Sequence, residues 1–460
     1  SLHADPIKRA ILDRDFPAQL ALAVAKVHIL PRPIFLLRAL PTRITRDALE
    51  TFDATLREAL RRRCDLPPDH ELSPSAFLQI SQPVGNSGLG LRSMRRVCPA
   101  GKWAAIAAAA SELQPFVDDS KHVLPCVADR DAAYAELVTA GVPVVAPEIT
   151  CYTQIEVDDA EQKKWGPYAD PRLRFLPSSP DAINTFYDGK SRLRSLQRML
   201  SRVSENAAFD NFISGSECPH EDRVRLTACR ASISGKWLIP QQAAVSLPDD
   251  AFRIAVRLRL GLSPFSFELP ACPLCRKGAG DPWHPFACPS VRRRAVTTRH
   301  DRAMRLVCEF ARACSATTRL EPKDFGSLVP DAEIFFNHDT ILCDFSGVHA
   351  TAPSHLASGP GRAVAARAAA KHAKYDAHAA ACDSRFVPLV VDCWGSVHDE
   401  FRELLKTFLE ESKRSCFAPA SGGLSLPDFL AAFSSQWQLD NARIVFQWQR
   451  ACRMLLSRNQ

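Results

Sequence analysis

The amino-acid sequence predicts a mixed α/β domain in the C-terminal half of the chain, preceded by a mostly α-helical N-terminal region. Residues 329–345 contain two short apolar runs around the polar turn Asn337-His338-Asp339, which is typical of a β-hairpin. An Ala-rich helical segment at 361–382 and an apolar strand at 386–394 follow the hairpin. Helix, hairpin, helix and strand in this order predict a mixed sheet flanked by helices.

The remaining helices are predicted from apolar residues that recur at helical spacing. They are expected at residues 16–30, 51–63, 102–113, 190–203, 291–314, 397–411 and 435–460, with a break at Pro31-Arg32-Pro33. The helix near residue 196 is both amphipathic and basic, with its leucines on one face. The N-terminal region is therefore expected to bury its core between helices.

The chain has 460 residues, which exceeds the size at which one hydrophobic core usually stops growing, so two or three domains are expected. No window approaches the uninterrupted apolar run of about 20 residues that a membrane span needs, and a soluble protein is expected. Residues 1–16 lack the basic start and apolar core of a secretory signal, and the first residue is Ser1. We therefore expect the chain to be part of a longer protein.

The net charge of +7 is modest, but the arginines are unevenly distributed. Basic clusters lie at residues 61–63, 190–202 and 292–305. The third cluster contains Arg292, Arg293, Arg294, Arg299, Arg302 and Arg305. Because it lies between Cys288 and the hairpin, we expect these six side chains to lie near the cleft and contact DNA phosphates. The alternative is that each cluster is only a solvated helix face.

Cysteine and histidine spacing predicts a structural zinc site. Sixteen cysteines in a chain without a secretory signal favour reduced thiols over a disulfide framework. Cys272 and Cys275 form a Cys-x2-Cys pair, and His284 and Cys288 follow at a short distance. Three thiolates and one imidazole match the closed tetrahedral shell of structural zinc. The alternative is an accidental Cys-x2-Cys pair beside an unrelated histidine.

Two aspartates at the outer ends of the hairpin predict a second metal site. If the turn centres on Asn337 and His338, antiparallel pairing sets Asp331 directly opposite Asp344. Like charges across a ladder repel, so the two carboxylates must reach water, share a proton or bind a cation. Mg²⁺ held between them would activate water for phosphodiester cleavage.

A lysine near the carboxylates would complete such a site by orienting the water or shielding the phosphate. The usual place for it, two residues after the second acid, holds Ser346. The candidates are Lys371 and Lys374 on the following helix, where Lys371 and Tyr375 share a face. Both lysines stay open as the catalytic residue, and a charged helix face is the alternative.

The C-terminal motifs resemble a known family when they are taken in order. They are Cys-x2-Cys, His-x3-Cys, Arg299-His300-Asp301, Glu321-Pro322, Pro330-Asp331, Asp344, Lys371-x2-Lys374-Tyr375 and the strand ending at Gly395. Over residues 237–411 this order resembles the restriction-like endonuclease of site-specific non-LTR retrotransposon proteins, which is similar to PD-(D/E)xK nucleases with the lysine moved onto a helix. The resemblance implies structural Zn²⁺, catalytic Mg²⁺ and catalytic roles for Asp331, Asp344, Lys371, Lys374, Tyr375, Glu321 and His300. The His-x3-Cys spacing departs from members with four residues there.

The N-terminal motifs are similar to the segment after the polymerase palm in the same proteins. They are Pro31-Arg-Pro-Ile-Phe-Leu-Leu-Arg38, Phe52-Asp53 and Gly88-Leu-Gly-Leu-Arg-Ser93, with Ser87 in place of a usual glycine. The resemblance implies a thumb-like region at 1–115, a helical linker with the basic helix at 116–236, a zinc linker at 237–290, the endonuclease at 291–415 and a helical tail at 416–460. A reverse transcriptase is expected upstream of this chain.

Polymerase activity is not expected within this chain. Phe116-Val-Asp-Asp119 has the letters of a polymerase turn but follows the thumb-like segment, and Tyr168-Ala-Asp170 continues into Pro171 instead of a second aspartate. The expected function is a Mg²⁺-dependent DNA endonuclease that nicks target DNA to prime reverse transcription. The alternatives are a catalytically silent nucleic-acid-binding module and, more weakly, a protein-interaction scaffold. The expected partners are target DNA, element RNA and the upstream polymerase domain, without a membrane, and the expected location is the nucleus.

Overall fold

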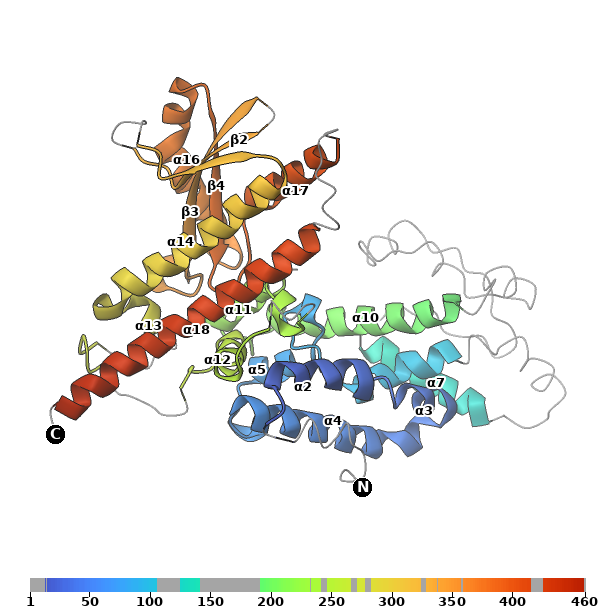
Figure 1. Cartoon of the computed structure of the whole chain (residues 1–460). Helices are drawn as coiled ribbons and strands as arrows, with labels where there is room; N and C mark the ends of the chain where they lie inside the picture. The colour runs from blue at the N-terminus through green and yellow to red at the C-terminus, as the bar shows by residue number, and fades with distance from the viewer. Residues whose placement is uncertain are drawn as a thin grey trace.

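The structure is a computed structural model, and it describes most of the chain (Figure 1). The described residues are 13, 15–105, 125–140, 191–231, 233–240, 246–265, 271–277, 283–323, 328–336, 338–356, 359–414 and 425–458. Within them a helix-rich N-terminal region is joined to a C-terminal half that contains a small mixed sheet. The predicted fold class is therefore confirmed at this coarse level. The polymerase-like motifs Phe116-Val-Asp-Asp119 and Tyr168-Ala-Asp170 lie outside the described residues.

The N-terminal region is built from helices whose boundaries follow proline and capping signals. The α-helices are α2 (Ala18–Val24), α3 (Ile34–Ala39), α4 (Thr42–Cys64), α5 (Pro74–Ser81), α7 (Pro125–Thr139), α10 (Ser191–Ser214), α11 (His220–Cys229) and α12 (Asp249–Arg259). A π-helical turn at Ala25–Ile29 follows α2, and Pro31 and Pro33 then separate it from α3, as predicted. Short 3₁₀ turns lie at Asp69–Glu71, Val84–Asn86 and Lys236–Leu238.

Burial of one face of each helix stabilises this region. Leu22, Leu37, Leu60 and Phe252 from four of these helices belong to one buried cluster. The capping serine of α5, Ser73, accepts a hydrogen bond from a backbone N–H of the first turn. The helical core expected from the periodicity is therefore present, and only the first residues of the helix expected at 102–113 are described.

The segment Ala18–Ala39 corrects one expectation from the sequence. By length and composition it is apolar enough to cross a membrane, and it lies near the N-terminus. In the structure it is broken by the π-turn and by two prolines, and its residues Leu22, Ile29 and Leu37 belong to the buried helical core. Core helices pass the same compositional test, so the segment by itself is weak support for a membrane span.

The C-terminal half contains a four-stranded sheet with the order β1-β2-β3-β4. Its strands are β1 (Thr317–Leu320), β2 (Ala332–Phe336), β3 (Asp339–Val348) and β4 (Arg385–Asp392). The first three strands form an antiparallel meander, and β4 pairs parallel with β3. The helices are α13 (His284–Ala287), α14 (Pro289–Ala313), α15 (Pro353–Leu356), α16 (Arg362–Ala381), α17 (Asp399–Arg414) and α18 (Leu426–Arg458).

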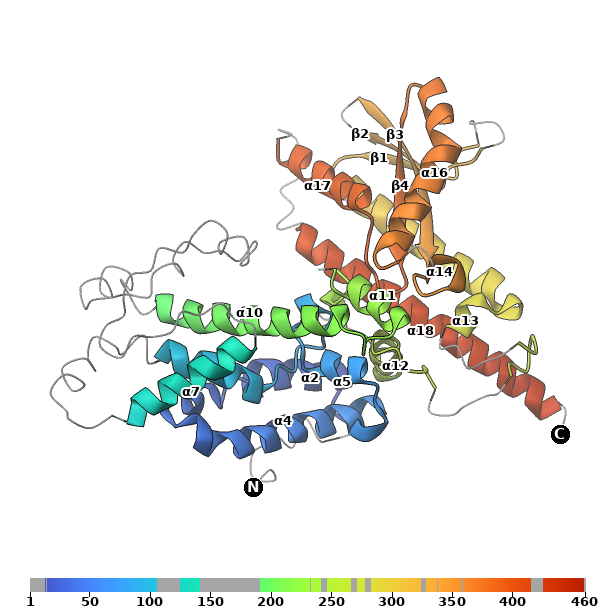
Figure 2. The same cartoon turned by 180° about the vertical axis from the view of Figure 1, so that it is seen from behind.

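Helices cover both faces of this sheet, as the two opposite views show (Figures 1 and 2). Tyr375 and Ala379 of α16 pack on one face against Leu342 and Phe386. On the other face, α14, α17 and α18 supply half of the buried residues of a larger cluster around Phe345. Since apolar residues line both faces, β3 and β4 are buried along nearly their whole lengths.

Several elements differ from the sequence prediction. Helix α4 begins at Thr42 rather than Thr51, and α5, α7, α11 and α12 were not predicted. Strand β1 was not predicted, because a four-residue edge strand with mostly exposed polar side chains carries no apolar pattern. The last helix begins at Leu426 rather than Ser435. This longer α18 packs against both α12 and α14, so it connects the N-terminal helices to the sheet (Figure 1).

Candidate functional sites: a metal cluster and a carboxylate pair

Cys272, Cys275, His284 and Cys288 converge as the spacing predicted. Their four potential ligand atoms all lie within 4.8 Å of one another, and three of the four residues are buried. The Sγ atoms of Cys272 and Cys288 are 3.9 Å apart, and Cys275 Sγ is 3.4 Å from His284 Nε2. This Cys3His cluster could hold a metal such as zinc.

The local chain explains why these residues meet. The Cys272 backbone N–H donates to Lys277 O and its carbonyl accepts from Arg276 N, both at 2.7 Å, which closes a tight turn. Arg276 has φ 59°, the left-handed conformation that such a turn requires. His284 begins α13, and Cys288 caps α14 immediately before Pro289. A turn and two helix ends therefore supply the four ligands.

Hydrogen bonds favour the thiolate form of Cys272, whereas burial and the neighbouring Cys272 raise the pKa of Cys288 to about 11. Burial alone would raise the pKa of Cys272, but backbone N–H groups of Cys275 and Leu274 hydrogen-bond its sulfur and lower the pKa to about 6. The indole N–H of Trp448 donates to the same sulfur at 3.3 Å. Because Trp448 belongs to α18, the cluster is anchored to the helix that connects the two halves.

The hairpin register brings the two aspartates to one end of the sheet. Ala332 pairs with Cys343 and Phe336 pairs with Asp339, which is the register predicted for the hairpin. The next residue outward from Ala332 is Asp331, and this register sets it opposite Asp344. Their carboxylates have different partners, because Asp331 contacts His300 of α14 and Asp344 contacts Lys371 of α16.

Asp331 is held by a histidine and by the backbone of β3. Its Oδ2 is 3.0 Å from His300 Nε2 and accepts a hydrogen bond of 2.6 Å from Phe345 N. His300 Nδ1 lies 3.2 Å from Asp301 Oδ1. Burial opposes a charge on His300, but the two aspartates outweigh it and raise the pKa of His300 to about 9. His300 is therefore protonated at neutral pH and forms an ion pair with Asp331.

Asp344 is paired with a lysine from α16. It is 5% exposed, and its Oδ2 accepts a hydrogen bond from Lys371 Nζ. Burial together with the neighbouring Asp344 carboxylate raises the pKa of Tyr375 well above its ordinary value. Lys374 Nζ donates to the Tyr375 hydroxyl at 2.8 Å and not to either aspartate. Lys371 therefore contacts the carboxylate pair directly, whereas Lys374 lies one step farther away.

Glu321 reaches this end of the sheet only through its backbone. Its N–H donates to Asp331 O at 3.0 Å, and its φ of 44° ends β1 in a left-handed turn. The Glu321 side chain is exposed. Of the residues expected to be catalytic, it is therefore the one whose side chain the structure leaves outside the contacts around the carboxylates.

The six arginines expected to contact DNA fall into different environments. Arg299 is 8% exposed and donates to Asn441 Oδ1 at 2.6 Å, and Arg302 pairs with Asp440 at 2.6 Å. Arg294 and Arg305 are exposed on α14 and lie on nearly the same face, since eleven residues make almost three whole helical turns. The side chains of Arg292 and Arg293 lie outside the described residues.

Arg367 belongs near this site although the sequence did not single it out. Its Nε donates to Ser346 Oγ at 2.8 Å, so it contacts the residue at the place where a lysine usually stands. Arg367 precedes Lys371 by one helical turn, and that i, i+4 spacing was the available signal.

Comparison with protein families and curated proteins gives no match, so the function is inferred from the geometry of the two sites. No protein-family model matches the chain, and no curated protein matches it. The two observations that remain are therefore physical. One is the converging Cys3His cluster, and the other is a pair of aspartates beside a lysine and a protonated histidine.

Proposed function

We propose that the C-terminal half is a Mg²⁺-dependent DNA endonuclease of the restriction-like kind, from a non-LTR retrotransposon protein that nicks target DNA to prime reverse transcription. The proposal rests on the open end of the hairpin. There the strand register sets Asp331 opposite Asp344, and Lys371 contacts Asp344. An antiparallel meander, a covering helix and a parallel fourth strand support the PD-(D/E)xK assignment.

The donor atoms at this position fit Mg²⁺. Hard divalent cations prefer carboxylate oxygens, and Asp331 uses only Oδ2 in its hydrogen bonds to described residues. Mg²⁺ bound between Asp331 and Asp344 would supply a water of lowered pKa and neutralise charge on the phosphate.

The chain's own residues have separate tasks in this proposal. Asp344 and Asp331 provide the cation ligands, and the hydrogen bond from Phe345 N fixes the orientation of Asp331. Lys371 Nζ, next to Asp344, orients the attacking water or shields the phosphate. Tyr375 holds Lys374 close to the site, and His300 limits the rotation of Asp331.

The second candidate is a silent nucleic-acid-binding module. It is favoured by one observation, namely that both carboxylates already have cationic partners within the chain, His300 and Lys371. Such pairs would persist without any metal. The element RNA, the upstream polymerase and a nuclear location belong to the first proposal and are likewise proposed.

A plasmid-nicking assay separates the two candidates. Purified full chain is incubated with supercoiled DNA in the presence of Mg²⁺ and, in parallel, without added Mg²⁺. The endonuclease proposal expects open-circular product only with Mg²⁺. Salt-dependent DNA binding without any nicking would support the silent module instead.

A further inference from the structure

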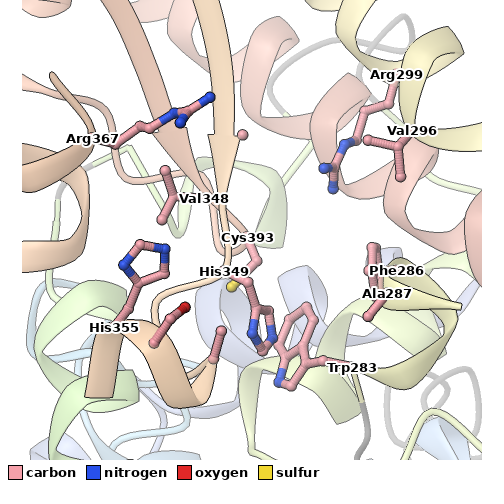
Figure 3. A pocket seen from close by; sticks show the side chains of 13 residues that line it. Trp283, Phe286, Ala287, Val296, Arg299, Val348, His349, His355, Arg367 and Cys393 are labelled. Carbon is pink, nitrogen blue, oxygen red and sulfur yellow. The ribbon is translucent and has the colours of Figure 1, made fainter. Parts of the chain in front are cut away.

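A cavity of about 470 Å³ lies where β3 and β4 end, next to the zinc-ligand segment (Figure 3). Residues from α13, α14, α15 and α16 line it together with Gly347, Val348 and Cys393. Neither Asp331 nor Asp344 lines it, so the cavity is distinct from the carboxylate pair. Its volume lies within the range of small-molecule sites.

The cavity is rich in cationic and imidazole groups. Arg299, Arg367, His349 and His355 line it, and none of its lining residues is Asp or Glu. Figure 3 shows these side chains entering the cavity from different elements. No ion pair joins Arg299 or Arg367 to a carboxylate among the residues that the structure describes. The cavity therefore favours an anion.

Two buried nitrogen atoms at this cavity lack hydrogen-bond partners. Arg299 Nε and His349 Nε2 have none within the described part of the chain. Burial and the charges of Arg299 and His355 lower the pKa of His349 to about 3, so it is neutral. Buried polar groups are rarely left unsatisfied, and such groups point to a ligand or to water.

Glycine at position 347 leaves space beside the buried Arg299 guanidinium. A Cβ there would lie 3.0 Å from Arg299 Nη2 and 3.1 Å from the Trp437 ring. A larger residue would therefore press on the guanidinium at the wall of the cavity. The absence of a side chain at this position leaves room for a ligand oxygen near Arg299.

Aromatic rings form another wall of the cavity. Trp283 and Phe286 lie side by side, with ring centroids 5.2 Å apart, and the His349 ring is 4.6 Å from Trp283. The Arg299 guanidinium lies 5.7 Å from the Phe286 ring. A guanidinium beside flat apolar rings suits a ligand that has both a phosphate and a base.

We propose that this cavity binds one nucleotide, with its phosphate at Arg299 and Arg367 and its base against Trp283 and Phe286. Arg367 lies one helical turn from Lys371 and contacts Ser346, two residues beyond Asp344 on β3. A DNA strand that leaves the carboxylate pair along α16 therefore reaches the cavity within a short distance. In this respect the inference rests on the proposed function.

Direct binding tests the cavity without any cleavage. Fluorescence anisotropy of a labelled short single-stranded DNA is measured with the full chain, in buffer without Mg²⁺ and without chelator. Arg367→Gln and Ser354→Glu, which places a carboxylate at the cavity, are each expected to weaken binding about tenfold, the loss of one charge-assisted contact. Arg362→Gln, an exposed arginine of α16 outside the cavity lining, is the matched control and should bind as the parent does.

Competition with unlabelled dAMP identifies the source of the nucleotide. If both variants bind the oligonucleotide more weakly than the parent does, the bound nucleotide belongs to a DNA strand. If they lower only the affinity for dAMP, the cavity binds a free nucleotide, and its link to cleavage is lost. Unchanged affinity for both ligands in two variants that melt like the parent overturns the cavity proposal. The nicking assay is read separately, so a protein that binds through the cavity but never nicks contradicts only the nuclease proposal.

Discussion

The Cys3His cluster and the aspartate pair are both groups of metal-binding residue types, but their surroundings differ. The four sulfur and nitrogen atoms of the cluster face one another within 4.8 Å. The aspartates instead each form an ion pair with a cationic side chain, Asp331 with His300 and Asp344 with Lys371. The ligand atoms of the cluster therefore face one another, whereas the aspartates are already paired with cationic side chains.

This difference teaches how a structural and a catalytic metal site are distinguished. A closed shell of protein ligands supplies folding free energy when it binds metal. Under the proposed function, the carboxylate pair would instead fold with its own counter-cations and bind Mg²⁺ only for catalysis. We therefore expect loss of zinc to affect stability and loss of Mg²⁺ to affect only activity.

The largest expected effect is that of breaking the cluster. Cys275→Ser should destabilise residues 237–314 by about 4 kcal/mol or more, because the folded chain loses a metal ligand. Thermal melting and metal analysis of the purified protein measure this. Cys382→Ser, at an exposed cysteine, is the control. A parent protein without zinc, or a Cys275 variant that melts like the parent, would contradict the prediction.

Removing a carboxylate should affect activity far more than DNA binding. Asp344→Asn and Asp331→Asn should each lower Mg²⁺-dependent nicking about 10³-fold, because several kcal/mol of charge stabilisation at the phosphate is lost. DNA affinity should change little, whereas the Asp331 variant should also lose the stabilisation from its ion pair with His300. Asp339→Asn, at the exposed turn of the same hairpin, is the matched control. Full nicking by the Asp344 variant would exclude it as a metal ligand.

The two lysines of α16 are expected to differ in their effect on nicking. Lys371→Ala should reduce nicking by about 10²-fold, since its Nζ contacts Asp344, whereas Lys374→Ala should have a smaller effect through Tyr375. Rates for both variants are measured at saturating Mg²⁺. The reverse order of effects would assign the catalytic role to Lys374.

The ion pair of His300 predicts a pH dependence of stability. Its pKa is raised from 6.5 to about 9 in the folded protein, so the stabilisation is complete below pH 6.5 and is lost as pH rises through 9. His300→Gln should lower the free energy of unfolding at pH 6 by roughly 1–2 kcal/mol, after allowance for solvent screening. Melting curves from pH 6 to 10 should show the difference shrinking. The exposed His70→Gln is the control, and a difference independent of pH would contradict the ion pair.

The smallest effect is expected from the exposed arginines of α14. Neutralising Arg294 and Arg305 together should weaken binding to specific and random duplexes alike and lower the salt slope by about one per phosphate contact. The dependence of log K on log salt concentration measures this. An unchanged slope would mean that these arginines form a solvated face and that DNA follows another path.

Local patterns were sufficient to predict several parts of the molecule. Alternation around Asn337-His338 specified the hairpin and, through its register, the pairing that sets Asp331 opposite Asp344. Short spacing specified the cysteine cluster, because a tight turn can aim two nearby thiolates at one point. Helical periodicity located α14, α16 and α17 to within a few residues. In each case the residues that carry the pattern lie close together in the sequence.

Other features depended on contacts between distant segments. The sequence could not choose between Lys371 and Lys374, because a difference of one position on α16 is resolved only by how the helix packs on β3. The interior position of Arg299 likewise depends on Asn441 and Trp437 of α18. Strand β1 exists because β2 offers it an edge, not because of its own apolar pattern.

The sequence by itself determined the chemical groups of this protein, namely four zinc-type ligands, two opposed aspartates and a series of basic side chains. Tertiary structure decided which of those groups share a site. It buried Arg299 beside a cavity, paired His300 with Asp331 and brought Arg367 to Ser346. The physical reason is that residue type and short-range spacing are local properties, whereas burial and partner choice arise only when separate helices and strands pack together.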